Sequence, residues 1–248
     1  MIWNYEPQTS RYGSKMLPPL KQITIFFCGW LGFRLFAYFL ELLIIIFGGS
    51  NSKEILSSLN TSMLINSSAY LVLLVAIVLI CNVDILKILR SFKRLPPYLM
   101  GIVCLITIYA FNFVYGLFLS ILPLETGDNA NEATLGLLSQ AYPIASYLIF
   151  GIIGPICEEF TYRVGLFSYF RRKSKAVAYI VTAIVFSLIH FNFSLNGAVL
   201  LNEVLNLPFY IFAALAFSFV FDKFGLAGSL TAHILNNILS LSLISVIR

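Results

Sequence analysis

The sequence predicts an all-α protein, a polytopic bundle of about seven transmembrane helices. Of its 248 residues, 59% are hydrophobic and only 11% are charged, whereas a soluble domain carries roughly 25% charged residues. Such a chain cannot cover its surface with polar groups, so lipid must be its solvent. Its apolar runs are long and continuous, which excludes the alternating pattern of a membrane β-barrel.

Each predicted helix is an apolar run long enough to cross a bilayer, which needs about 20 residues. Seven stretches qualify: 22–47, 63–83, 99–122, 142–168, 176–194, 204–221 and 225–246. Pro208 falls near the start of the sixth stretch, where a helix does not need its missing amide. Residues 1–21 form a short cytoplasmic tail, and residues 22–248 form a single transmembrane domain. Residues 123–141 form an acidic outer loop.

The basic residues predict the orientation of the bundle. Apart from Arg34, which lies inside the first stretch, 13 basic residues fall on one side of the predicted bundle and 2 on the other. Because cytoplasmic loops carry the excess of Lys and Arg, the amino terminus is predicted to be cytoplasmic. The same asymmetry explains the net charge of +5 without a nucleic-acid partner. Arg34 and Glu41, two turns apart on one face, are expected to have structural, bundle-facing roles.

The fourth stretch carries three charged residues, Glu158, Glu159 and Arg163. Each costs about 2.5–3.5 kcal/mol at the centre of a spanning helix, so such residues usually mark a functional site. Glu159 and Arg163 are i,i+4 neighbours and can pair, which leaves Glu158 free to react. The alternative is a purely structural ion pair, but this alternative does not account for Glu158.

Both histidines of the chain fall in predicted spans. His190 follows Phe186 in the fifth stretch, and His233 shares a helix face with Asn237 in the seventh. Such residues often only join helices by hydrogen bonds. However, at 1.5 Å per residue, Glu158 and these three polar side chains all lie about 15–22 Å from the basic ends of their helices. Their common depth favours one shared site.

These residues resemble the motifs of the CPBP family, which contains the type II CAAX prenyl endopeptidases and the Abi bacteriocin-processing and immunity proteins. The resemblance covers about residues 140–240 and rests on three motifs in order: EExxxR (Glu158, Glu159, Arg163), FxxxH (Phe186, His190) and HxxxN (His233, Asn237). It implies an intramembrane protease in which a helical bundle surrounds a cavity open to the cytoplasm.

By this resemblance, Glu158 activates the attacking water with help from His190, while His233 and Asn237 stabilise the oxyanion. Glu159, Arg163 and Phe186 support the site. No cofactor is favoured, because the Glu–Glu–Arg pattern balances its charge without a cation. Zinc held by Glu158, His190 and His233 is the alternative.

The expected substrate is a membrane-associated peptide or protein, such as a pheromone, a bacteriocin or a signal-peptide remnant. The expected location is the bacterial plasma membrane, with the site reached from the cytoplasmic side. Two other classes stay open. One is a non-proteolytic immunity or signalling scaffold; the other is an ion-coupled transporter, which also uses midplane carboxylates. The oligomeric state is not predicted.

Overall fold

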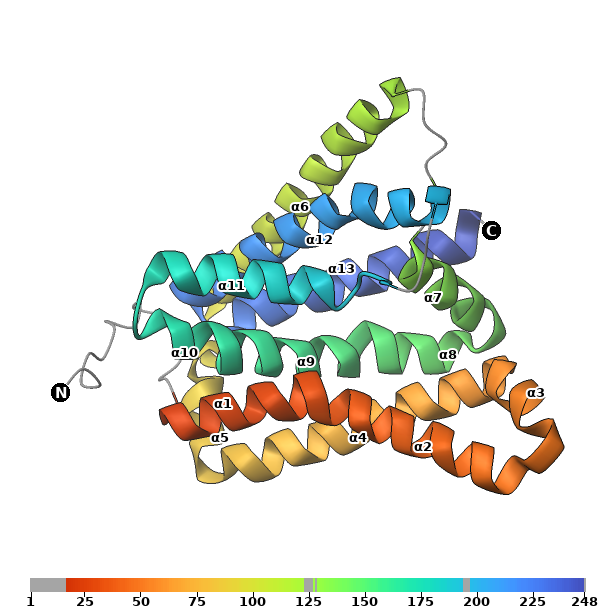
Figure 1. The fold of residues 1–248 in the computed structure, drawn as a ribbon. Helices are drawn as coiled ribbons and strands as arrows, with labels where there is room; N and C mark the ends of the chain where they lie inside the picture. The colour runs from red at the N-terminus through yellow and green to blue at the C-terminus, as the bar shows by residue number, and fades with distance from the viewer. Residues whose placement is uncertain (1–16, 123–126, 128, 194–196, 248) are drawn as a thin grey trace.

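The computed structural model (Figure 1) describes residues 17–122, 127, 129–193 and 197–247. These residues form a bundle of helices without a strand, which confirms the predicted all-α class. Six of the helices are long and apolar enough to cross a membrane, and a seventh apolar helix is shorter. The chain is therefore an integral membrane protein. The expected tail, residues 1–21, lies mostly outside the described residues.

The first half of the chain contributes three spans. Their helices are α1 (Pro19–Phe27), α2 (Phe33–Gly48), α3 (Ser52–Ser57), α4 (Leu59–Cys81), α5 (Ile85–Ile88) and α6 (Leu95–Ile121). A π-helical turn, Cys28–Gly32, joins α1 to α2 without a break in the span. Pro19 begins α1 at the position where a helix tolerates proline, and the Ser58 hydroxyl caps α4 by accepting from the Thr61 amide.

The second half surrounds the candidate site. Its helices are α7 (Ala130–Ala141), α8 (Pro143–Ser146), α9 (Gly154–Glu158), α10 (Ser168–Arg171), α11 (Lys175–Leu188), α12 (Gly197–Phe224) and α13 (Leu226–Ile247). Two π-helical segments, Tyr147–Ile153 and Glu159–Phe167, link α8, α9 and α10 into one span. Gly225, whose φ is +82°, separates α12 from α13, a conformation that glycine adopts readily.

Three expectations about the elements were wrong. The fifth span, expected at 176–194, ends at Leu188, so His190 lies just beyond the helix. The sixth span, expected at 204–221, begins at Gly197 and carries Pro208 in its interior. There the Tyr115 hydroxyl donates to the Leu205 carbonyl (3.0 Å), which follows the Val204 carbonyl that Pro208 leaves without its helical hydrogen bond.

The third wrong expectation concerns the acidic outer loop, residues 123–141, which contains the helix α7. The Asn129 side chain caps this helix by accepting from the Glu132 amide (2.8 Å). An asparagine in this position stabilises the start of a helix, so Asn129 is the residue by which the sequence indicates α7.

Ion pairs and hydrogen bonds join the helix ends that carry the basic residues. Lys21 at the start of α1 pairs with Asp84 (2.7 Å), and Arg171 at the end of α10 pairs with Asp222 of α12 (2.9 Å). Figure 1 shows α1, α5 and α10 at one end of the bundle and α3, α7 and the carboxyl terminus at the other. The bundle therefore has a basic end and an α7 end, as the orientation argument requires.

The helices α6 and α13 cross at two glycines. A Cβ atom on Gly101 of α6 would lie 2.7 Å from the Gly228 carbonyl oxygen and 2.9 Å from the Thr231 Cβ atom. Small residues allow this close approach of spanning helices, which supplies packing that lipid cannot. The far part of α6 leans away from the bundle (Figure 1) and exposes large apolar side chains such as Phe113 and Ile121.

Replacement of Gly101 by leucine is expected to force α6 away from α13, because the closest obstacle is backbone. The free energy of unfolding in mixed micelles should fall by about 1–3 kcal/mol or more. Gly116→Leu is the matched control on the same helix, since nothing lies within 4 Å of its added Cβ atom. Equal losses in the two variants would contradict the proposed role of the crossing.

Candidate active site

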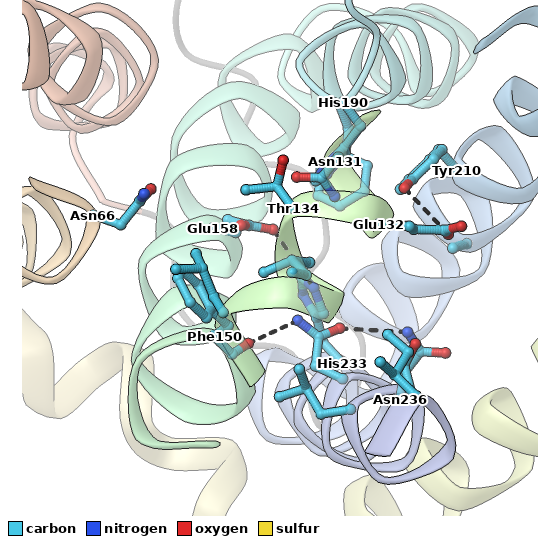
Figure 2. Close-up of a pocket in the computed structure, with 18 of the residues that line it drawn as sticks. Asn66, Asn131, Glu132, Thr134, Phe150, Glu158, His190, Tyr210, His233 and Asn236 are labelled. Atoms are coloured by element: carbon cyan, nitrogen blue, oxygen red, sulfur yellow. Dashed lines mark hydrogen bonds and ion pairs between the residues drawn. The ribbon is translucent and has the colours of Figure 1, made fainter. Parts of the chain in front are cut away.

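All four expected catalytic side chains line one cavity of about 210 Å³. Glu158 comes from the end of α9, His190 from the turn after α11, and His233 and Asn237 from α13. Figure 2 shows Glu158, His190 and His233 around the same space, with Asn131, Glu132 and Thr134 of α7 beside them. The structure thus brings together the side chains that their common depth predicted to meet.

His233 lies between the two glutamates. Its Nδ1 is 3.0 Å from Glu159 Oε1, and its Nε2 is 3.6 Å from Glu158 Oε2. A carboxylate on one ring nitrogen orients the imidazole and determines which nitrogen carries the proton. If Glu159 accepts from Nδ1, then Nε2 faces Glu158 as the nitrogen that exchanges a proton with it. Of the two histidines, His233 is therefore the one that contacts Glu158 directly, whereas the resemblance implies help to Glu158 from His190.

His190 lies in the same cavity but stacks on Tyr210 of α12. The two ring centroids are 4.5 Å apart and the planes differ by 12°. The Phe186 ring is 5.2 Å from the His190 ring and 6.0 Å from the His233 ring, so Phe186 contacts both imidazoles. Transfer of a proton between His190 and Glu158 would need a water or a substrate group between them in the cavity.

Arg163 confirms the predicted i,i+4 pair with Glu159, since its Nε is 3.5 Å from Glu159 Oε1 and both side chains are fully buried. Its guanidinium lies 4.6 Å from the Phe186 ring centroid and 5.4 Å from that of Phe217. Among the described residues, none of its three nitrogens has a hydrogen-bond partner. The two aromatic faces and one carboxylate therefore hold this charge.

Asn237 donates to the Phe150 carbonyl (3.0 Å). Phe150 lies in the π-helical segment Tyr147–Ile153, where the helix pitch changes and backbone carbonyls lose their usual partners. One amide hydrogen of Asn237 is used by this bond. The described residues provide no acceptor for the other, and Asn237 lines the cavity.

Sequence reasoning missed several residues of the site. The Tyr70 hydroxyl of α4 donates to Glu158 Oε1 (3.1 Å), so one oxygen of the Glu158 carboxylate is already bound. Tyr210, Asn131 and Glu132 also line the cavity. No spacing in the sequence relates Tyr70 or α7 to the three motifs, and only the packing of the helices shows their positions.

The α7 helix covers the cavity at the end of the bundle opposite the basic residues. Glu203 of α12 is buried, and its two oxygens accept from the backbone amides of Ala130 (2.7 Å) and Asn192 (2.9 Å). One carboxylate thus holds both α7 and the turn after α11. The expected opening toward the cytoplasm is not supported by this lining, because the cavity extends from Glu158 toward the α7 end.

The residues that zinc would need do not converge on one point. Among the described residues, no group of three or more His, Cys, Asp and Glu side chains is arranged to hold a metal ion. Glu158 and His233 are adjacent, but His190 is held against Tyr210. The donor set therefore does not fit a metal in this arrangement, and would do so only if this imidazole rotated.

The fold and the site define a polytopic membrane protein with a carboxylate–imidazole centre inside the bilayer. Residues 140–239, about two fifths of the chain, match the family model "Type II CAAX prenyl endopeptidase Rce1-like". This match confirms the resemblance drawn from the three motifs. It contains all the predicted site residues, whereas the first three spans lie outside it.

A curated relative, an uncharacterised protein of Mycoplasma capricolum, is 27% identical over 170 residues. The alignment covers 64% of this chain and 48% of the relative, so the chain spans about half the length of the curated relative it matches. No solved structure matches the chain significantly.

Replacement of Glu159 by glutamine is expected to destabilise the fold, because Arg163 then has no opposite full charge beside it. Breaking a buried ion pair typically costs about 3–5 kcal/mol. Arg163→Met alone should cost a similar amount. The double variant Glu159→Gln/Arg163→Met should lose clearly less than the sum, since no uncompensated charge is left. Free energies of unfolding in mixed micelles measure this coupling, and additive losses would contradict it.

The docking of α7 is expected to weaken as the pH rises. Glu132 lies on α7, outside the spans, and burial raises the pKa of its carboxyl; Glu203 nearby raises it further, while the Tyr210 hydrogen bond lowers it. A raised pKa means that docked α7 holds the proton more tightly. Its contribution is therefore complete below the ordinary glutamate pKa of about 4.3 and is lost as the pH rises through the raised value.

Amide-exchange protection of α7, corrected for intrinsic rates, measures this effect between about pH 4 and about pH 8. Protection should fall across this range in the wild type and should change little in Glu132→Gln. A fall of the same size in both proteins would assign the effect to another group.

Proposed function

We propose that the protein is an intramembrane endopeptidase that hydrolyses a peptide bond in a membrane-associated peptide or protein by means of a water activated by Glu158. The observation that carries this proposal is the position of Glu158. Its carboxylate faces the cavity and is bound by Tyr70 on one oxygen and His233 on the other. A carboxylate that only stabilised the fold would not require a cavity beside it.

In the proposed reaction, Glu158 accepts a proton from a water while the oxygen of that water attacks the carbonyl carbon of the substrate. The carbonyl oxygen becomes an oxyanion, and donors within the cavity stabilise it. His190 and the second amide hydrogen of Asn237 are the candidates for this role. Glu158 then returns the proton to the leaving amine as the carbon–nitrogen bond breaks.

His233 has a separate role in this proposal. Because Glu159 orients it, the imidazole can share the proton that Glu158 has taken and can spread the resulting charge. Arg163 balances Glu159 and so keeps the pair of carboxylates from repelling each other. Glu159 and Arg163 are thus positioning residues, and Phe186 shields them.

We further propose that the protein lies in a bacterial plasma membrane and that substrate enters near α7 rather than from the cytoplasmic side. The cavity lining supports this entrance, since it includes Asn131, Glu132 and Thr134 of α7. With the basic end in the cytoplasm, the α7 end is the outer face. Peptides that pass through the membrane or remain in it after export would therefore be accessible.

Replacement of Glu158 by glutamine is expected to abolish processing, because the amide cannot accept the proton from water. A positioned general base contributes typically about 10²–10⁴-fold to a rate. Mass spectrometry of membrane peptides from cells with wild-type protein and with Glu158→Gln measures the loss. Glu54→Gln, on the short outer helix α3, is the control.

Unchanged peptide profiles at equal protein abundance would favour the non-proteolytic scaffold, and transport that depends on membrane potential would favour the transporter. Chelator treatment of the purified wild-type enzyme distinguishes a metal-free glutamate mechanism from a zinc-dependent one. The glutamate mechanism predicts full activity after chelation, whereas loss that is restored by added zinc would support a metal site that includes Glu158 and His233.

A further inference from the structure

The segment that connects α4 to α6 lies at the basic end of the bundle (Figure 1). The helix α4 has 23 residues, or about 35 Å, which is enough to cross a hydrocarbon layer of about 30 Å. It ends at Cys81, because the next residue, Asn82, adopts a φ of +45° that an α-helix does not allow. The helix α5 and the 3₁₀ helix Leu89–Lys93 therefore lie outside this layer. Residues 82–94 are called the connecting segment below.

One face of the connecting segment is bound to the bundle. Asp84 pairs with Lys21 of α1 (2.7 Å), and the Ser91 hydroxyl accepts from the Ala227 amide at the start of α13 (3.0 Å). Ile88, between them in the chain, is 1% exposed. Positions 84, 88 and 91 are spaced i, i+4 and i+7, so they share one helix face. The segment is therefore fixed between α1 and α13 by this face, and its opposite face is left exposed.

The opposite face combines positive charge with an exposed apolar side chain. Its exposed basic residues are Lys87, Arg90, Lys93 and Arg94. Of these four, only Lys87 forms an ion pair with a described residue, Asp84 (2.5 Å). Leu86, one turn before Arg90, is 75% exposed. Such a surface is typical of segments at the headgroup level of a membrane, where apolar side chains enter the acyl boundary and cations meet phosphates.

The amino end of α6 adds to this positive potential. The helix begins directly after Arg94, and no side chain caps it. A helix carries a partial positive charge at its amino end, which favours an anion there. Because α6 begins where the connecting segment ends, its dipole acts on the same place as the exposed cations.

Neighbouring basic residues at this end of the bundle interact within the protein. Arg171 pairs with Asp222 (2.9 Å). The Nζ atoms of Lys173 and Lys175 lie 5.4 Å and 5.8 Å from the centroids of two tyrosine rings, which attract cations. The positive charge that is available to an outside partner is therefore concentrated on the connecting segment.

We propose that the connecting segment binds the headgroups of anionic phospholipids. The charges are complementary, and an arginine can hold a phosphate with two parallel hydrogen bonds. Leu86 fits the acyl boundary beside the headgroups, which a soluble phosphate does not provide, so the partner is a lipid. Because Ser91 binds the start of α13, the bound lipid also steadies the helix that carries His233. This inference does not depend on the proposed function.

The test measures lipid binding by the full-length protein in dodecyl maltoside micelles, from the rise of its unfolding midpoint as lipid is added. The probes are phosphatidylglycerol, which is anionic, and phosphatidylcholine, which is neutral. The wild type should bind phosphatidylglycerol at least roughly tenfold more tightly. Arg90→Gln/Arg94→Gln should weaken this binding by roughly tenfold to thirtyfold, because each cation near a membrane surface contributes about fivefold. Its binding of phosphatidylcholine should not change.

Two further double variants make the result specific. Lys173→Gln/Lys175→Gln removes the same charge from the same end of the bundle and should weaken binding by less than about threefold. A loss equal to that of Arg90→Gln/Arg94→Gln would mean that net charge alone attracts the lipid, and would overturn the proposal. Arg90→Lys/Arg94→Lys should keep most of the preference, because the charge remains. Unfolding midpoints without lipid separate lost binding from lost stability.

Equal affinity of the wild type for the two lipids would also contradict the proposal. So would stabilisation of the same size by soluble glycerol phosphate at the same concentration, since the site would then bind phosphate without a membrane. Raising the salt concentration from about 0.05 M to about 0.5 M should weaken the binding of phosphatidylglycerol, because salt screens exposed charges. Binding that does not respond to salt would show that these cations do not hold the headgroup.

Discussion

The structure depends on a group of charged and polar side chains that the protein keeps out of both water and lipid. Glu159, Arg163 and His233 are all buried, and each is oriented by at least one of the others. In a medium of low polarity such charges are expensive unless they are paired, so removing one affects the rest. Glu158 is the member of this group that keeps access to a cavity. The proposed reaction uses this access, because a water or a substrate group in the cavity can reach the Glu158 carboxylate.

Aromatic rings cover the Arg163 guanidinium, which the described residues do not hydrogen-bond. The guanidinium of Arg163 has more donors than the described residues have acceptors for them, and the faces of Phe186 and Phe217 cover it instead. The same two rings contact the imidazole of His233. Phe186 and Phe217 therefore determine where the guanidinium and the imidazole can lie.

The cavity exists because one helix is short and another lies across the end of the bundle. With only 14 residues, α11 ends within the depth of its neighbours, and His190 follows in a turn. Glu203 then binds the backbone of both this turn and α7. The helix α7 and the turn after α11 thus form a polar cover over the site. A single helix, α7, lies between the site and this end of the bundle.

The sequence by itself determined the class of fold, the spans to within several residues, and the residues of the three motifs. Hydrophobic length and the distribution of Lys and Arg are local properties of the chain, so they can be read without knowledge of its neighbours. The pairing of Glu159 with Arg163 was equally readable, because i,i+4 spacing on one helix places them together. Only the tertiary structure decided that His233 rather than His190 contacts Glu158 and that Tyr70 binds this carboxylate. These contacts join helices that are far apart in the sequence, and their geometry depends on helix crossing, π-helical turns and the end of α11, none of which has a local signal.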